Sequence, residues 1–404
     1  MIFTLAWRNL WRHKRRTFFT MAAIALTCVV VVFLPSLQAG TYAGMVRNYI
    51  GILDGYAQIQ HEDYLETPSM RDSFRPNDGL QAALKTLPAG IHTAERGVAY
   101  GLLSSEKRSI GAQIIGVQPE KETYISSLPS NIVGGHYLTE DNEIVLGKAL
   151  ADNLQVDVGD SVTLLGVGHD GSLAADVLSV AGIFRTGTLE LDRSLAEMTL
   201  ARFDTSFAMD GQRHEIVING ADPSALSAAL DILKPPAAAA GLALRDWRAL
   251  QPGLESAIRL DITSAVVIYA VLIIIVALSL LNTIFMSVLE RTREFGMMMA
   301  LGVTPGLLAR VVWGEIGILA LLGVLLGMGT GAGLVIATAR DGITFESTQA
   351  IFAQYGMSST MYPELTSLTL LAGPLAIVSA LMLAGLFPAL RILRLNLLKS
   401  MRAA

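Results

Sequence analysis

The chain has 404 residues, of which 52% are hydrophobic and 16% are charged, and its mean hydropathy is +0.49. This composition excludes an intrinsically disordered protein and is typical of a multi-pass membrane protein with a substantial water-soluble part. The net charge of −5 is unevenly distributed: residues 40–258 hold 16 Lys and Arg against 28 Asp and Glu, whereas the other residues hold 14 against 7. The basic excess therefore lies beside the apolar segments described next.

Residues 1–16 predict an amphipathic helix. Phe3, Trp7 and Trp11 fall on one face at helical spacing, and the basic residues lie mostly elsewhere. A basic helix with tryptophan on its apolar side is suited to the membrane interface. We interpret this segment as an elbow helix on the cytoplasmic leaflet, or as a positively charged anchor with no further role.

Four apolar segments are long enough to cross the roughly 30 Å hydrocarbon core of a bilayer. The first is residues 17–39, and the other three, 259–289, 306–338 and 365–390, are crowded at the far end of the chain. A cleaved signal peptide is the alternative for the first segment, but about 20 residues is long for a signal core. The fold class that we predict is an α-helical membrane protein with four transmembrane helices in a 1+3 order.

We predict that residues 40–258 form a large α+β domain outside the membrane. Strand and helix patterns at both of its ends predict a split α+β layer, with a β-rich subdomain inserted at about residues 134–202. Pro235 and Pro236 predict a loop. The only cysteine, Cys28, lies in the first apolar segment, so the domain must fold by core burial without a disulfide.

The basic residues predict the orientation of the chain. They precede the first apolar segment and also lie within the loop 290–305 and the tail 391–404. The loop 339–364, by contrast, holds only one basic residue, Arg340. By the positive-inside rule, both termini and the loop 290–305 are cytoplasmic, and the large domain is periplasmic or extracellular. We expect a multi-pass protein of the bacterial inner membrane.

Three glycines recur at four-residue spacing in the third apolar segment. Gly323, Gly327 and Gly331 would let two membrane helices approach closely. We predict a tight helix seam here, either within the chain or between two subunits. The alternative is that glycine is simply frequent in membrane helices.

The chain shows no motif for catalysis, nucleotide binding or metal binding. It has no phosphate-binding loop, no HExxH or GxSxG sequence and no paired-cysteine zinc pattern. Glu315 is the one candidate for a buried functional carboxylate in the apolar segments, and we expect it to be hydrogen-bonded to a neighbouring helix. We therefore predict no catalytic residue, cofactor or metal in this chain, and we expect the energy for any work to come from a partner.

The sequence ERTREFGMMMALG at residues 290–302 places charges of both signs directly after a membrane segment and three methionines after the charges. Methionine side chains make an adaptable apolar face, which suits a short helix that docks in a groove of another protein. A solvated connector is the alternative.

This motif resembles the coupling segment of the MacB/LolC/FtsX group of ABC transporter permeases, which usually reads ERxxEIGxxxAxG. The resemblance extends along the chain: residues 6–17 are similar to the group's elbow, residues 134–165 to its periplasmic-domain signature, and residues 388–401 to its tail, where Asn396 replaces the usual proline. The resemblance implies that an ATPase docks on Glu290, Arg291, Arg293, Glu294, Gly296 and Gly302.

The resemblance also implies the partners. Relatives combine two permeases, identical or homologous, with two copies of a cytoplasmic ABC ATPase, which here would be a separate subunit that holds ATP and Mg. Movement of the membrane helices is relayed to the periplasmic domains, which is called mechanotransmission. We expect contacts with membrane lipids and with either a periplasmic adaptor or a lipoprotein substrate, and none with nucleic acid.

Three functions stay open from the sequence. Lipoprotein or lipid release is favoured, tripartite efflux of antimicrobials or peptides is the second hypothesis, and a regulatory scaffold for a cell-wall hydrolase is the third. We expect the substrate to contact two segments, Phe33–Tyr42 and Leu254–Thr263, because each joins a membrane helix to the large domain.

Overall fold

A computed structural model describes residues 2–12, 14–344 and 360–393. The middle of the predicted loop 339–364 and most of the predicted tail 391–404 lie outside these residues. The chain divides into two compact units. Of the described residues, 2–12, 14–44, 257–344 and 360–393 form a helical unit, and 45–256 form an α/β unit.

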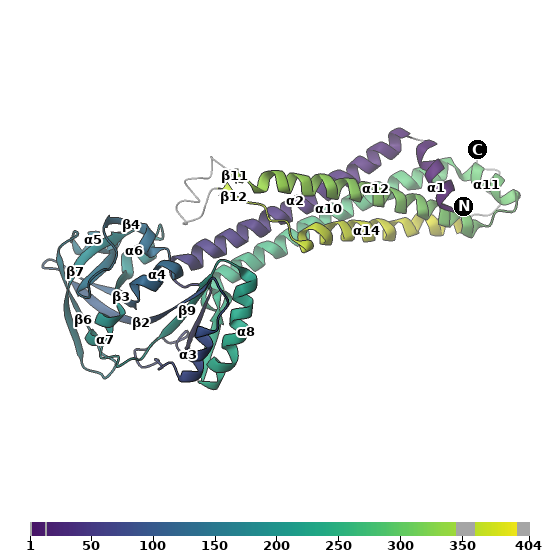
Figure 1. The fold of residues 1–404 in the computed structure, drawn as a ribbon. Coiled ribbons are helices and arrows are strands. Elements are labelled where there is room, and N and C mark those ends of the chain that lie inside the picture. Colours follow the sequence, from purple (N-terminus) through teal and green to yellow (C-terminus); the bar gives the residue numbers. More distant parts are fainter. Residues whose placement is uncertain (1, 13, 345–359, 394–404) are drawn as a thin grey trace. The chain divides into compact units, whose positions relative to one another are not determined.

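The helical unit is a bundle of long helices with two short ones at one end (Figure 1). Its described elements are α1 (Ile2–Arg12), most of α2 (Lys14–Ile52), most of α10 (Pro252–Glu290), α11 (Thr292–Ala300), α12 (Pro305–Ala339), α14 (Ser367–Leu393) and a small hairpin of β11 (Ile343–Thr344) and β12 (Thr360–Met361). Helices α2, α10, α12 and α14 are long and apolar enough to cross a membrane. The predicted 1+3 fold class is therefore confirmed.

Two helices are longer than the apolar segments from which they were predicted. Helix α2 continues past residue 39 to Ile52, and α10 begins at Pro252 rather than at residue 259. Hydropathy locates the part of a helix that suits a bilayer, whereas a helix ends where a stop signal occurs. For α2 that signal is Gly55, which has a φ of +66° and donates its N–H to the Ile50 carbonyl at 2.8 Å.

The first layer of the α/β unit is a four-stranded antiparallel sheet in the order β10-β1-β9-β2, with α3 and α8 packed against it. Its elements are β1 (Ala57–His61), α3 (Asp78–Lys85), the first part of β2 (Ile91–Ser104), β9 (Glu215–Gly220), α8 (Pro223–Ala239) and β10 (Leu242–Asp246), followed by the short α9 (Trp247–Leu250). This β-α-β-β-α-β order is the split arrangement of ferredoxin-like folds.

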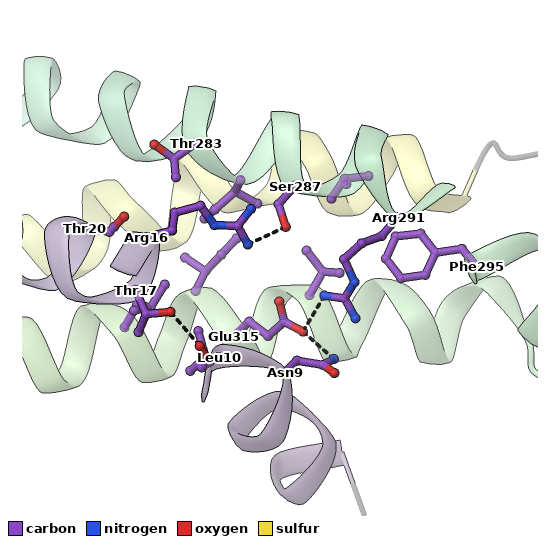
Figure 2. A pocket seen from close by; sticks show the side chains of 15 residues that line it. Asn9, Leu10, Arg16, Thr17, Thr20, Thr283, Ser287, Arg291, Phe295 and Glu315 are labelled. Carbon is purple, nitrogen blue, oxygen red and sulfur yellow. Dashed lines mark hydrogen bonds and ion pairs between the residues drawn. The ribbon is translucent and has the colours of Figure 1, made fainter. Parts of the chain in front are cut away.

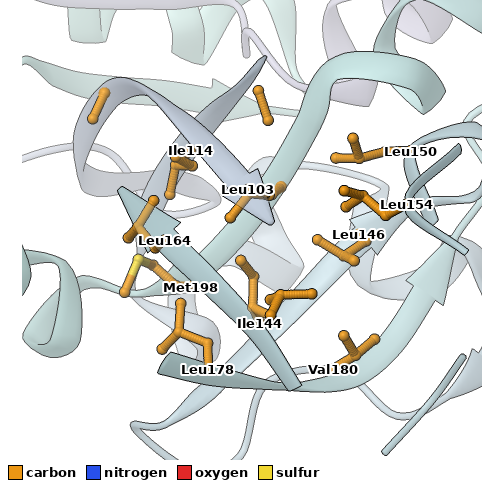
Figure 3. Close-up of a cluster of buried hydrophobic side chains, with 14 of the residues drawn as sticks. Leu103, Ile114, Ile144, Leu146, Leu150, Leu154, Leu164, Leu178, Val180 and Met198 are labelled. Carbon is orange, nitrogen blue, oxygen red and sulfur yellow. The ribbon is translucent and has the colours of Figure 1, made fainter. Parts of the chain in front are cut away.

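The second layer is a closed barrel in which β2, β3, β8, β5, β7 and β6 pair in turn and β6 returns to β2. Its further elements are β3 (Ser109–Val117), α4 (Pro119–Ile125), η1 (Leu128–Asn131), β4 (Ile132–Gly135), β5 (Glu143–Gly147), α5 (Lys148–Leu154), β6 (Ser161–Val167), β7 (Leu173–Phe184), α6 (Leu189–Ser194), β8 (Leu195–Thr199) and α7 (Leu200–Ser206). Leu103, Ile144 and Leu164 are fully buried in its core (Figure 3). Closure removes the exposed strand edges that an open sheet would present.

The structure differs from two sequence predictions in this unit. The β-rich part begins near Gly97 rather than at residue 134, because β2 is a single strand that leaves β9 after Arg96 and pairs with β3 from Gly97 onward. A sequence pattern identifies a strand but not the point where it changes partner. The predicted loop at Pro235 and Pro236 is wrong: α8 continues to Ala239.

Glu197 on β8 is fully buried, which is unusual for a carboxyl group. Its Oε2 accepts a hydrogen bond from the Tyr137 hydroxyl at 2.8 Å, and its Oε1 has no hydrogen-bond partner among the described residues. Burial, together with the nearby charge of Glu122, raises the pKa of Glu197 to about 8, although Arg96 acts in the opposite direction. The folded protein therefore holds a proton that the unfolded chain would release near pH 4.5.

We expect the free energy of unfolding of this unit to fall as the pH rises from 5 to 9, because the native state binds the Glu197 proton more tightly than the unfolded state does. Glu197→Gln cannot ionise, so the variant should match the wild type at pH 5 and exceed it at pH 9 on the order of a few kcal/mol, since one pKa unit is about 1.4 kcal/mol. Hydrogen exchange of β8 peptides in the full chain measures this difference. Glu190→Gln on the exposed side of α6 is the control, and equal protection of wild type and Glu197→Gln at pH 9 would contradict the assignment.

Candidate functional site

Helix α11 carries three of the six residues that the sequence predicted to dock on a partner, and the other three lie just outside its ends. It starts immediately after α10, and its Phe295 and Met299 are buried in the core of the helical unit. Gly302 ends the turn with a φ of +93°, and its N–H bonds to the Met299 carbonyl at 3.0 Å. Because glycine adopts this left-handed conformation without a steric penalty, the place of Gly302 is explained by helix termination.

Polar side chains connect α11, and Arg291 directly before it, to α1 and α12; Figure 2 shows the part that Asn9, Arg291 and Glu315 form. Glu315 Oε1 accepts a hydrogen bond from Asn9 Nδ2 at 2.7 Å and lies 3.4 Å from Arg291 Nη1. Glu294 pairs with Arg12 at 3.1 Å and with Arg291 at 3.4 Å. We call these five residues the α11 cluster. The expected hydrogen bond from Glu315 to a neighbouring helix is confirmed, and the structure uses Arg291 and Glu294 for contacts within the chain.

The face of α11 that stays exposed is narrower than the sequence suggested. Met299 is buried and Met298 packs on the core, so only Met297 points outward, with 53% of its surface exposed. Arg293 is also exposed, and Leu301 is 86% exposed. The positions 293, 297 and 301 are four residues apart and therefore form one stripe on a helical surface.

Two further predicted docking residues do not belong to this stripe. Glu290, at the end of α10, is exposed and lies 3.7 Å from Arg16. Gly296 is buried in α11, so it contributes close packing rather than an exposed contact.

The structure places the three seam glycines against α2 of the same chain. A Cβ added to Gly327 would lie 2.4 Å from the Cys28 Cβ and 2.6 Å from the Ala25 carbonyl oxygen. Gly323 would meet the Ile24 side chain at 2.8 Å, and Gly331 would meet Val29 and Val32 at 3.3 Å. At Gly329 and Gly333, by contrast, nothing lies within 4 Å. The seam therefore brings the backbones of α2 and α12 close together.

A largely apolar groove of about 430 Å³ lies between α2, α10 and α14, near the start of α10. Its walls include Val31, Pro35, Ile262, Val266, Leu368 and Gly373. The predicted substrate region contributes part of the α2 wall and Ile262 of α10. The α14 wall was not foreseen, because no pattern in the sequence indicates which helix packs beside α2.

Four polar side chains, three of which line this groove, form a hydrogen-bonded group that we call the rim. Tyr269 donates its hydroxyl hydrogen to Gln38 Oε1 at 2.9 Å, and Tyr42 donates to Asp261. Gln38 Nε2 also donates to Asp261 Oδ2 at 3.3 Å. Gln38, Tyr42 and Tyr269 line the groove as well. An apolar trough with a polar end has the shape and chemistry to hold a lipid-like molecule with its head at the rim.

Two family models match the chain. The MacB-like periplasmic core domain matches residues 17–235, and the FtsX-like permease C-terminal model matches residues 266–397. Together they cover most of α2, the large domain up to residue 235 and most of the last three membrane helices.

Curated relatives match most of the chain. The lipoprotein-releasing system transmembrane protein LolC of Neisseria meningitidis serogroup B is 23% identical over 355 residues, which cover 84% of this chain and 83% of that protein. LolC of Xylella fastidiosa is 26% identical over 322 residues, which cover 74% of this chain and 75% of that protein.

Solved structures are similar to about half of the chain. The periplasmic region of MacB from Actinobacillus actinomycetemcomitans is 14% identical with a TM-score of 0.37 and covers 51% of this chain and 94% of that structure. The extracellular domain of the transporter YknZ from Gram-positive bacteria is 13% identical with a TM-score of 0.34 and covers 47% and 98%.

We predict that Gly327→Ala destabilises the helical unit by about 1–3 kcal/mol, because the added methyl group would overlap the backbone of α2. Gly329→Ala is a matched control two residues away that meets open space and should be neutral. Thermal unfolding of the purified protein in detergent, followed through Trp313 on α12, compares the two. Equal unfolding temperatures for both variants would show that the seam does not hold the helices together.

Proposed function

Because the chain belongs to the family of FtsX-like permeases with a MacB-like periplasmic core domain, we propose that it couples ATP hydrolysis by a separate ABC ATPase to the release of lipoproteins from the membrane. In this proposal the α11 end of the helical unit faces the cytoplasm and both termini lie there. The large domain is periplasmic, as the family implies. ATP and Mg bind to the ATPase and not to this chain.

The groove between α2, α10 and α14 is the observation that carries the choice of substrate. A hydrocarbon chain that moves from lipid into an apolar groove gains little hydrophobic free energy, because lipid tails are already apolar. The hydrogen-bonding rim of Gln38, Tyr42, Asp261 and Tyr269 must therefore supply the preference for one lipid-like molecule over another. Such a site suits an acyl chain that is attached to a polar group.

The cost of extraction explains why such a substrate needs an ATPase. Exposing a buried acyl chain to water costs about 0.8 kcal/mol per methylene group, so a chain of about 16 carbons costs on the order of 12 kcal/mol. We propose that the ATPase docks on the exposed stripe of Arg293, Met297 and Leu301. A displacement of α11 would reach α1 and α12 through the α11 cluster, and α2 through the glycine seam. This path is the form of mechanotransmission that the contacts support.

Efflux of amphiphilic antimicrobials or peptides is the second candidate. The side chains that line the groove are mostly apolar and include no charged group, and such walls would also accept a small amphiphile. The two candidates share the ATPase but differ in the second partner, which is a lipoprotein for release and a periplasmic adaptor for efflux.

We predict that an ABC ATPase and lipoproteins copurify with the wild-type chain in mild detergent. Met297→Glu with Leu301→Glu should lose the ATPase, since two charges replace the apolar part of the docking face, but should keep the lipoproteins. Mass spectrometry of the copurified proteins measures both.

The control for this experiment is Met297→Leu with Leu301→Met, which keeps the face apolar and should retain the ATPase. Copurification of an adaptor without lipoproteins would favour efflux, and a cell-wall hydrolase would favour a regulatory scaffold. Absence of any ATPase from the wild-type sample would refute the proposed function.

A further inference from the structure

A group of ionisable residues, three of them buried, lies in the α/β unit where β2 changes partner. Arg96, which is 1% exposed, is the last residue of β2 that pairs with β9, opposite Glu215, and Gly97 is the first that pairs with β3. Glu122 and Glu197 are fully buried beside it. We call Arg96, Glu122, Glu197 and Glu215 the Arg96 cluster. It lies at the junction of the ferredoxin-like layer and the barrel.

The Arg96 guanidinium also holds the end of α2. Its Nη1 donates to the Leu53 carbonyl at 2.8 Å, and Leu53 is the first residue after α2. Its Nε and Nη2 form a two-point ion pair with Glu122 of α4, with Nε 3.3 Å from Oε2. Just beyond α4, Ser127 donates its N–H to the carbonyl of Gly51 at 2.8 Å. The end of α2 is therefore hydrogen-bonded to two segments of the unit, β2 through Arg96 and the residues after α4 through Ser127.

The start of α10 is tied to the same place. Gln251, the residue before α10, donates from Nε2 to Asp54 Oδ2 at 2.6 Å. Gln251 follows α9, whose Trp247 is buried in the unit, and its N–H bonds to the Trp247 carbonyl at 2.8 Å. The points at which the chain enters and leaves the α/β unit are thus joined to each other and to the Arg96 cluster.

Stability alone does not account for such a cluster. Removing an arginine and several carboxylates from water is costly, and apolar residues of similar volume often give equal or greater stability. A planar guanidinium with fixed donors holds the groups that it binds in a defined relative orientation, and apolar packing does not.

We propose that the Arg96 cluster is a joint that fixes the C-terminal end of α2 and the N-terminal end of α10 to both layers of the α/β unit, so that a displacement of the two helices moves the unit as one body. Arg96 acts in it as a positioning residue. The role of this joint in coupling to an ATPase rests on the proposed function, but the rigidity of the joint does not. The rigidity and the proposed function can therefore be tested separately.

The test measures distances by pulsed electron spin resonance in the full chain, reconstituted in lipid nanodiscs. Cys28→Ala removes the native thiol, and Tyr49→Cys on α2 is paired with Leu173→Cys on the barrel or Asp231→Cys on α8, all three being exposed positions. The wild-type background should give one narrow distance distribution for each pair. Arg96→Met with Glu122→Leu, which removes both members of the ion pair, should lose the narrow distribution.

The matched control removes an ion pair that lies within the barrel. Arg202→Met with Asp176→Leu breaks the pair between α7 and β7 and should leave both distributions narrow. Arg96→Lys keeps the positive charge but loses the planar fork, so it should broaden the distributions even if the double variant does not fold. Narrow distributions in every folded Arg96 variant would overturn the joint, whether or not an ATPase copurifies with the wild type. A wild type without an ATPase would refute the proposed function and leave this result untouched.

Discussion

The close packing of α2 against α12 is the contact on which the account of the helical unit depends. In a bilayer the hydrophobic effect does not drive helices together, so association relies on the fit of their surfaces. Gly323, Gly327 and Gly331 supply that fit by letting the two backbones approach. Because α2 is one continuous helix from Lys14 to Ile52, the helix held at this seam is the same one that enters the α/β unit.

The two chemically distinctive regions of the helical unit lie at opposite ends of α10. Asp261, in the rim of the groove, is near the start of this helix, and Arg291 of the α11 cluster directly follows its end. About 30 residues of helix, or roughly 45 Å, separate them. A docking event at α11 can therefore influence the groove only through movement of packed helices, and this separation is the physical reason for a mechanical form of coupling.

The sequence was most informative where the pattern is local. Apolar length predicted the four membrane helices, and the spacing of Gly327 and its neighbours predicted close packing. The remaining features depend on tertiary contacts: Met299 turns inward because α11 packs on the core, and α14 completes the groove. The Arg96 cluster is the extreme case, since its members come from β2, α4, β8 and β9, and only the topology of the sheet brings them together.

The most direct test of the central claim is photocrosslinking from within the groove. A photoreactive amino acid at Val266 lies in the groove wall, whereas one at Val267, which is equally exposed but outside the groove, samples the surroundings. The account predicts that Val266 captures lipoproteins, that Val267 does not, and that ATP reduces the Val266 product in membranes that contain the ATPase. Capture of the same lipids at both positions, with no lipoprotein at Val266, would contradict it.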